Sequence, residues 1–147
     1  MSFETTLAKF GYPGSIVSEN KHWYILLRPE QITFASMILI TKNEKNSSFA
    51  KLKPPEQAEM FLAIQKIEKV AFNKINCNKI NYLALMMVDP FVHYHVLPRY
   101  KKPKVFKDIE FIDPGYPGVP DLTYETSLTE NEFYKLVAHL KGLFDET

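Results

Sequence analysis

The chain has 147 residues, of which 46% are hydrophobic, and these values predict one domain with a substantial core over residues 1–147. Its 18 Lys and Arg nearly balance its 17 Asp and Glu, which argues against a nucleic-acid coat or a polybasic membrane anchor, and no stretch approaches the roughly 18 apolar residues of a membrane span. A single cysteine, Cys77, excludes a disulfide within the chain and a four-cysteine zinc site, and it fits a cytoplasmic protein.

The N-terminal part of the chain predicts a short helix followed by strands. Residues 2–10 suit a helix, because Ser2 can cap it, Phe3 and Leu7 recur at helical spacing, and Gly11 can end it. Stretches rich in aromatic and branched residues then predict strands at residues 15–18, 22–28 and 36–41. The last two are close enough in sequence to pair antiparallel.

The longest predicted helix begins at Pro54-Pro55 and ends between residues 73 and 78. Its apolar side chains recur with the helical period and predict a buried stripe along one face. That stripe is expected to contain Phe61, Ile64, Ile67 or Glu68, Ala71 and Ile75, widened by Leu62 and Phe72.

Two strand patterns follow this helix. Residues 80–89 (INYLALMMVD) form a nearly continuous apolar run, which predicts a central strand buried on both faces. After Pro90, residues 91–97 alternate, so that Phe91, His93, His95 and Leu97 face one way while Val92, Tyr94 and Val96 face the other. Pro98 is expected to end this strand.

The C-terminal part begins with an irregular stretch after Arg99 and a rigid, extended surface segment at Asp113–Pro120. A helix is then predicted after Thr129, which forms a capping box with Glu132, while Leu128 and Phe133 suit a hydrophobic staple. Together the elements predict an α+β domain with a mostly antiparallel sheet of about five strands, one long helix and a helix at each end. The core is expected at about residues 15–100, with residues 101–147 packing on it.

The two histidines of the strand at residues 91–97 point into the same space, about 6.6–7 Å apart along the strand axis. One imidazole could attack phosphorus while its neighbour donates a proton or holds a phosphoryl oxygen. A His-x-His pair also binds metals when a third ligand joins it, for which Asp89, His22 and His139 are available. The pair could equally be structural, and its spacing does not distinguish these alternatives.

The wider run Val92–Arg99 (VHYHVLPR) resembles the signature of the histidine triad (HIT) superfamily, in which three histidines alternate with hydrophobic residues and Leu-Pro-Arg often follows. His93 matches the central histidine, and His95 with its tail matches the third. The strands and the long helix upstream are similar to those of the family, so the resemblance covers about residues 21–100. The LLRP and MMVDP stretches resemble a bacterial HIT-like subgroup.

This resemblance implies a HIT-like fold and a nucleotide hydrolase or nucleotidyl transferase that acts at the α-phosphate of a nucleotide derivative, such as diadenosine tetraphosphate or a nucleoside phosphoramidate. His93 would be the nucleophile that forms a covalent nucleotidyl-histidine, and His95 would contact the phosphate. Arg28, Asp89 and Arg99 are the candidate nucleotide-binding residues. No intrinsic metal or cofactor is implied, although a divalent metal can accompany the substrate. A homodimer paired through the long helix and a sheet edge is expected, without membrane or nucleic-acid partners.

The chain departs from the family pattern at two places. Phe91 stands at the position of the first histidine, where its side chain can neither hydrogen-bond nor titrate. The loop before the signature strand is short. Many HIT hydrolases have small polar residues there that contact the phosphates, whereas this chain has Met86, Met87 and Val88. These departures favour a second interpretation, a HIT-like protein that binds nucleotides with little or no turnover.

Overall fold

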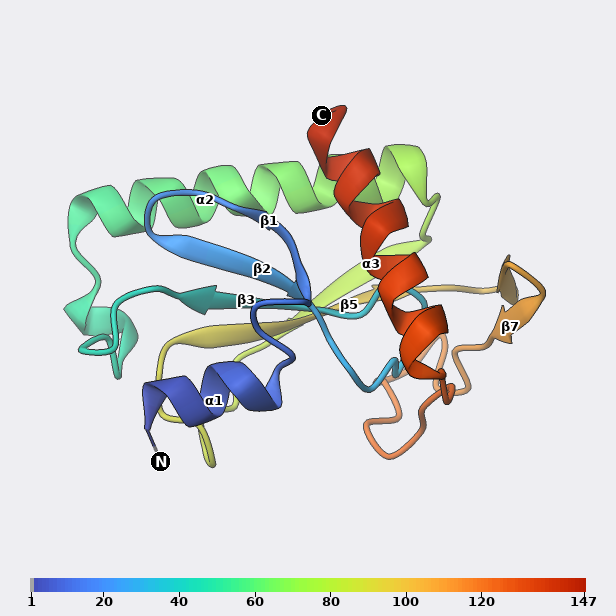
Figure 1. Ribbon diagram of the computed structural model, residues 1–147, viewed down its shortest axis with the longest axis horizontal. Coiled ribbons are helices and arrows are strands. Elements are labelled where there is room, and N and C mark those ends of the chain that lie inside the picture. The colour runs from blue at the N-terminus through green and yellow to red at the C-terminus, as the bar shows by residue number, and fades with distance from the viewer. Residues whose placement is uncertain (1) are drawn as a thin grey trace.

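The computed structural model describes residues 2–147, which form a five-stranded antiparallel sheet, three α-helices and a separate small hairpin (Figure 1). The elements are α1 Phe3–Lys9, β1 Ile16–Glu19, β2 Trp23–Leu27, β3 Met37–Thr41, α2 Pro54–Lys69, β4 Lys79–Leu83, β5 His93–Arg99, β6 Lys104–Phe106, β7 Ile109–Phe111 and α3 Glu130–Asp145. The sheet has the order β1-β2-β3-β5-β4, with every neighbouring pair antiparallel. The predicted α+β class is confirmed. In the described part of the chain, no helix combines the length and the apolar character needed to cross a membrane.

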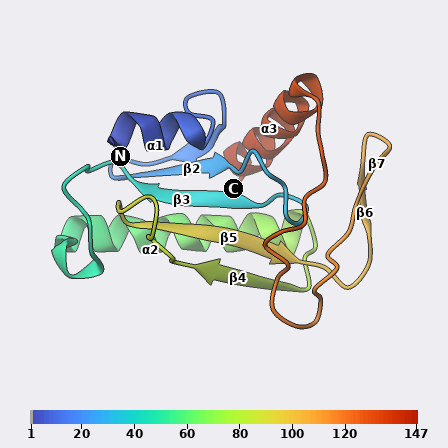
Figure 2. The ribbon, with the colours of Figure 1, turned by 90° about the horizontal axis from the view of Figure 1, so that it is seen from below.

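The two faces of the sheet are covered by different helices. Successive side chains of a strand point to opposite faces, so Trp23 and Leu39 join one core with residues of α2 and α3. Ile38 and Ile40 belong to a second, smaller core with Leu7 and Phe10 of the N-terminal segment. Figures 1 and 2 show α1 and α2 on opposite sides of the sheet.

The local signals at the two terminal helices are confirmed. The side chain of Ser2 accepts a hydrogen bond from the Thr5 amide at 3.1 Å and caps α1. Thr129 and Glu132 form the reciprocal capping box of α3, with bonds of 3.1 and 2.8 Å. These interactions lie within three residues, which is why the sequence alone predicts them.

The predicted apolar stripe of α2 is wrong at its edges. Phe61 and Leu62 are 59% and 58% exposed, whereas Ala63 and Ile67 are buried against the sheet. The helix therefore meets the sheet through a narrower stripe of smaller residues, and two large apolar side chains lie outside it. Beyond Lys69 the helix continues as a π-helical turn over Val70–Lys74.

The prediction of a central strand at residues 80–89 is also wrong. Only Lys79–Leu83 forms a strand, β4, and it lies at the sheet edge beside β5 (Figure 2). Its side chains are mostly half-buried, and Met87 farther along is 86% exposed. An apolar run indicates burial on average, but here its second half forms a loop beside the histidines.

The strand β5 is shifted relative to its prediction, since it begins at His93 and continues through Pro98 to Arg99. Pro98 is tolerated because β3 pairs with β5 only as far as Val96, so β5 has one neighbour, β4, beyond that point. The predicted faces are confirmed, because Val92 and Val96 lie in the core beneath α2.

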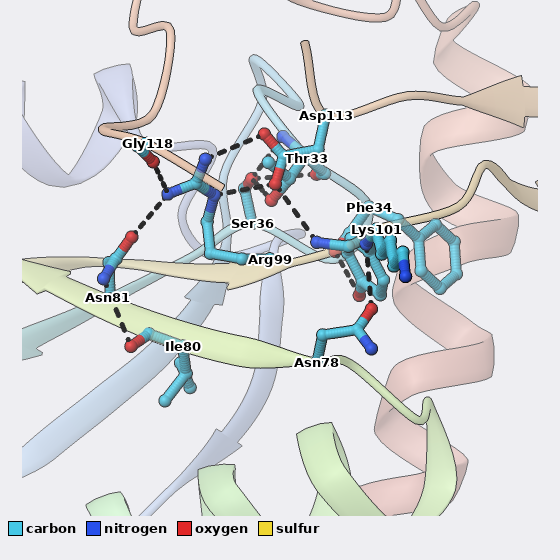
Figure 3. Close-up of polar contacts among 11 residues, drawn as sticks. Thr33, Phe34, Ser36, Asn78, Ile80, Asn81, Arg99, Lys101, Asp113 and Gly118 are labelled. Atoms are coloured by element: carbon cyan, nitrogen blue, oxygen red, sulfur yellow. Dashed lines mark hydrogen bonds and ion pairs between the residues drawn. The ribbon is translucent and has the colours of Figure 1, made fainter. Parts of the chain in front are cut away.

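The segment after β5 is more ordered than predicted. Its expected irregular start is the β6–β7 hairpin, whose two turn residues Lys107 and Asp108 both have positive φ. The Asp113–Pro120 segment is held through the guanidinium of Arg99, as Figure 3 shows. Arg99 donates to both carboxylate oxygens of Asp113 at 2.7 and 3.0 Å, and to the Gly118 carbonyl at 3.0 Å.

Candidate active site

The fold brings His93 and His95 together on the face of the sheet that α1 covers. The two side chains stand opposite Ile40 and Ile38 of β3, which belong to the core beneath α1. Their ring centroids are 5.1 Å apart. The side chain of Phe10, directly after α1, packs against both rings, with centroids 5.6 and 6.2 Å away. The predicted pairing of the two imidazoles on one face is therefore confirmed.

His93 is held by the backbone two residues before it. Its Nδ1 lies 2.7 Å from the carbonyl oxygen of Phe91. Since a carbonyl oxygen only accepts, this nitrogen carries the proton and Nε2 keeps the free lone pair. Burial lowers the pKa of His93, against the opposing effects of the Phe91 carbonyl and the Asp89 charge. The ring is thus a neutral imidazole, 2% exposed, with its unprotonated nitrogen available as a nucleophile.

His95 has the opposite tautomer. The Nε of Arg28, at the end of β2, donates to His95 Nδ1 at 3.3 Å. Because a guanidinium has no acceptor, Nδ1 must hold the lone pair and the proton must lie on Nε2. Burial first, then the charge that His93 gains when it is protonated, and then the Arg28 cation lower the pKa of His95 to about 4. At neutral pH this ring can donate a hydrogen bond while its neighbour attacks.

Asp89 stands beside the histidines but is already bound. Its two carboxylate oxygens accept hydrogen bonds from the Thr6 hydroxyl, at 2.9 Å, and from the Lys9 ammonium. Burial alone would raise the pKa of Asp89, but the bonds from Lys9 and Thr6 outweigh it and hold that pKa below its ordinary value. The carboxylate is therefore ionised and neutralised by α1 before any ligand arrives.

A cavity of about 340 Å³ opens at the histidines, a volume that suits a small-molecule ligand. Lys9 and Phe10 line it on one side, and Arg28 and Glu30 line it at the end of β2. The loop after β4 supplies the remaining wall with Leu85, Met86, Met87, Val88 and Asp89. The apolar part of the predicted central strand thus forms the wall of a pocket.

Of the predicted site residues, the structure gathers four and leaves one apart. His93, His95, Arg28 and Asp89 line the same cavity. Arg99 lies on the same face of β5 as His95, but four residues away, which is about 13 Å along a strand. Its guanidinium is buried and bound to Asn81 and to the C-terminal segment, so in this structure Arg99 holds that segment, and its contact with the nucleotide stays a prediction.

Of the side chains considered as a third metal ligand, Asp89 shares the cavity with the two histidines but is bound by Thr6 and Lys9, and His22 and His139 lie elsewhere. The amide of His22 bonds to the side chain of Glu59 in α2, and His139 packs on Phe106 of the hairpin. Within residues 2–147, no three His, Cys, Asp or Glu side chains are grouped as a metal site would require.

The contribution of α1 to the site is the main feature that sequence reasoning missed. Lys9 and Thr6 lie 80 and 83 residues before Asp89, and no local pattern links residues so far apart. The sequence contains only an indirect indication that α1 reaches the site. An amphipathic helix with apolar Phe3, Leu7 and Phe10 must cover some surface, and the sheet face with the histidines is where it packs.

Comparison with known proteins places this geometry in a family. The model of the HIT domain matches residues 10–102. The fold is similar to a histidine triad protein from Marinobacter aquaeolei VT8, with a TM-score of 0.71 and 19% identity over 89% of this chain and 88% of that one. It is also similar to a HIT protein from Sinorhizobium meliloti 1021, with a TM-score of 0.73 and 18% identity over 96% and 95% of the two chains. A zinc-bound histidine triad family protein from Mycobacterium smegmatis has a TM-score of 0.64 and 15% identity over 99% of this chain and 96% of that one.

No curated protein matches the sequence. The family match covers more than half of the chain and includes both histidines, and the chain therefore belongs to the HIT family.

Proposed function

We propose that the protein is a nucleotide hydrolase or nucleotidyl transferase that acts at the α-phosphate of a nucleotide derivative through His93. The observation that carries this proposal is the hydrogen bond from His93 Nδ1 to the Phe91 carbonyl, which leaves Nε2 free for attack. Because the bond uses the main chain of Phe91, the replacement of the first histidine by phenylalanine leaves it intact.

In the proposed reaction, His93 Nε2 forms a bond to the α-phosphorus while the bond from phosphorus to the leaving group breaks and the leaving group takes a proton from solvent water. Water or another acceptor then attacks phosphorus, gives up its proton to solvent, breaks the nitrogen–phosphorus bond and releases His93. His95 would donate its Nε2–H to a phosphoryl oxygen, where negative charge develops in both steps. Arg28 would contact the nucleotide beside His95. The protein supplies no metal in this scheme, although a divalent cation can enter with the phosphates.

A second candidate is a nucleotide-binding protein with little turnover. The ring of Phe91 packs edge-on against Phe3, with centroids 5.0 Å apart, so an apolar pair stands where the family has an imidazole. A protein of this kind would bind nucleotides through His93, His95 and Arg28, but it would lack a titratable group at that position.

The test is a turnover screen with diadenosine tetraphosphate, adenosine 5′-phosphoramidate and ADP, combined with calorimetric binding of AMP. We expect the wild-type protein to hydrolyse at least one of these compounds. In His93→Ala the rate of that hydrolysis should fall by several orders of magnitude. His139→Ala is the matched control, because this exposed histidine lies on α3 beside Phe106. Binding of AMP without turnover of any compound would favour the second candidate. Wild-type rates in His93→Ala would refute the first.

The proposal extends to assembly and location. We expect a homodimer, supported by the exposed Phe61 and Leu62 on α2 and by β4 at the sheet edge. Sedimentation velocity would test it, and a monomer at micromolar concentration would refute it. The near-neutral charge supports a small-molecule partner, with neither nucleic acid nor membrane. A cytoplasmic location is supported by the single Cys77, which leaves the chain without an internal disulfide.

A further inference from the structure

The helix α1 lies wholly outside the segment that the family model matches, yet it contacts the candidate site closely. The match begins at residue 10, and α1 spans Phe3–Lys9. The hydroxyl of Thr6 and the ammonium of Lys9 both bind Asp89. The helix α1 therefore brings a lysine ammonium to the site, a group that the signature strand β5 does not contain.

A cavity that binds phosphate needs positively charged side chains, and few of the residues that line this cavity carry a positive charge. The loop residues Leu85, Met86, Met87 and Val88 have no charged side chain, and Asp89 and Glu30 are acidic. Among the lining residues that the structure describes, Lys9 and Arg28 are the cationic ones.

Both cations have donors left for a ligand, but they are held by different partners. Arg28 donates through Nε to His95 and through Nη1 to the Glu30 carbonyl, and it also pairs with the Glu30 carboxylate at 3.6 Å. Lys9 gives one bond to Asp89, whereas an ammonium carries three donors. Its side chain is 42% exposed and lines the cavity, so its other donors face a ligand or water.

Asp89 explains why the ammonium stays at this place. The carboxylate is buried and held on its other oxygen by Thr6, so it anchors Lys9 at the edge of the cavity on the His93 side. In turn, Lys9 neutralises a carboxylate that would otherwise repel an anionic substrate. Arg28 stands at the opposite end of the histidine row, beside His95.

We propose that Lys9 is a substrate-binding residue whose ammonium, anchored by Asp89, contacts a phosphoryl oxygen of the nucleotide. This inference rests on the proposed nucleotide site and adds a residue to it that the HIT signature does not contain. A charge-assisted hydrogen bond of this kind is worth roughly 10- to 100-fold in affinity.

The test compares AMP with adenosine by calorimetry on the full chain, because the ratio of the two affinities isolates the phosphate contact. We expect Lys9→Met to lower this ratio by about 10- to 100-fold, and Lys9→Arg to keep most of it. Lys69→Met is the matched control, since Lys69 is an exposed lysine in the last turn of α2. It should leave the ratio unchanged.

A double variant separates substrate contact from simple charge balance. If Lys9 touches phosphate, Lys9→Met combined with Asp89→Asn stays weak, because the lost donor is not replaced. Recovery of the wild-type ratio in this double variant would overturn the proposal, since Lys9 would then act only by neutralising Asp89. An unchanged ratio in Lys9→Met would overturn it as well.

A measurement on the wild-type protein covers the case in which Lys9→Met fails to fold. The side-chain Cε and Nζ resonances of Lys9 should shift when AMP is added and not when adenosine is added. The absence of such a shift, with AMP bound, would refute the role of Lys9 while leaving the nucleotide site intact. A wild-type protein that binds neither AMP nor inorganic pyrophosphate would instead refute the proposed function, and this inference with it.

Discussion

The bidentate pair between Arg99 and Asp113 should be one of the strongest determinants of stability in this chain. The two side chains are 4% and 1% exposed, and Asp113 also accepts from the Tyr100 amide at 3.1 Å. Asp113→Ala removes three acceptor contacts and leaves a buried guanidinium with Asn81 and Gly118 as its remaining partners. Breaking a buried pair from one side costs about 3–5 kcal/mol. For a chain of this size, that corresponds to a fall of roughly 6–20 °C in melting temperature.

Urea and thermal unfolding followed by circular dichroism would measure this loss. The matched control is Glu19→Ala, which breaks an exposed pair with Lys42 (2.6 Å) and should cost less than about 1 kcal/mol. The double variant Arg99→Met/Asp113→Leu should lose far less than Asp113→Ala, because no uncompensated charge stays buried. A loss below about 1 kcal/mol for Asp113→Ala would refute the reasoning.

Three further outcomes follow from the site and the core. In wild-type protein the NMR titration of His95 should have its midpoint near pH 4, and Arg28→Gln should move it upward by removing the adjacent cation; a midpoint at an ordinary histidine value would contradict the assigned environment. The pKa values of His93 and His95 are lowered in the folded state, so the unfolded state binds protons first. The free energy of unfolding should therefore be fully retained above about pH 6.5 and fall as the pH drops toward 4, and urea titrations at pH 7.5 and 5 with equal results would exclude this linkage. Leu140→Ala on α3 empties a fully buried position and should cost about 2–5 kcal/mol, whereas Leu143→Ala on the same helix, at a partly buried position, should cost less; equal losses would contradict the assigned packing.

The elements that sequence alone predicted well have local causes. The capping residues Ser2 and Thr129 act within three residues, and the strands at residues 22–28 and 36–41 are marked by β-branched and aromatic residues and bounded by turns. Because His93 and His95 are two residues apart on a strand, their common face follows from the pleat, and their pairing needed no tertiary information.

The features that sequence reasoning missed depend on distant partners. Arg99 ends the signature strand, but its partner Asp113 lies 14 residues later, at the start of a Pro- and Gly-rich segment whose pattern does not indicate what it contacts. Met87 belongs to a run as apolar as a buried strand, yet it lies in a loop at the cavity. Lys9 reaches the site because of the way α1 packs on the sheet, which depends on the whole fold.

The central claim is that His93 Nε2 becomes covalently bound to the α-phosphorus of a nucleotide. The most direct measurement is rapid quenching of the protein with its best substrate at alkaline pH, followed by intact-mass analysis and peptide mapping. We predict one nucleotidyl group on the peptide that contains His93, labile to acid, absent in His93→Ala and retained in His139→Ala. A nucleotidyl group on another residue, or turnover by His93→Ala at the wild-type rate, would contradict the account.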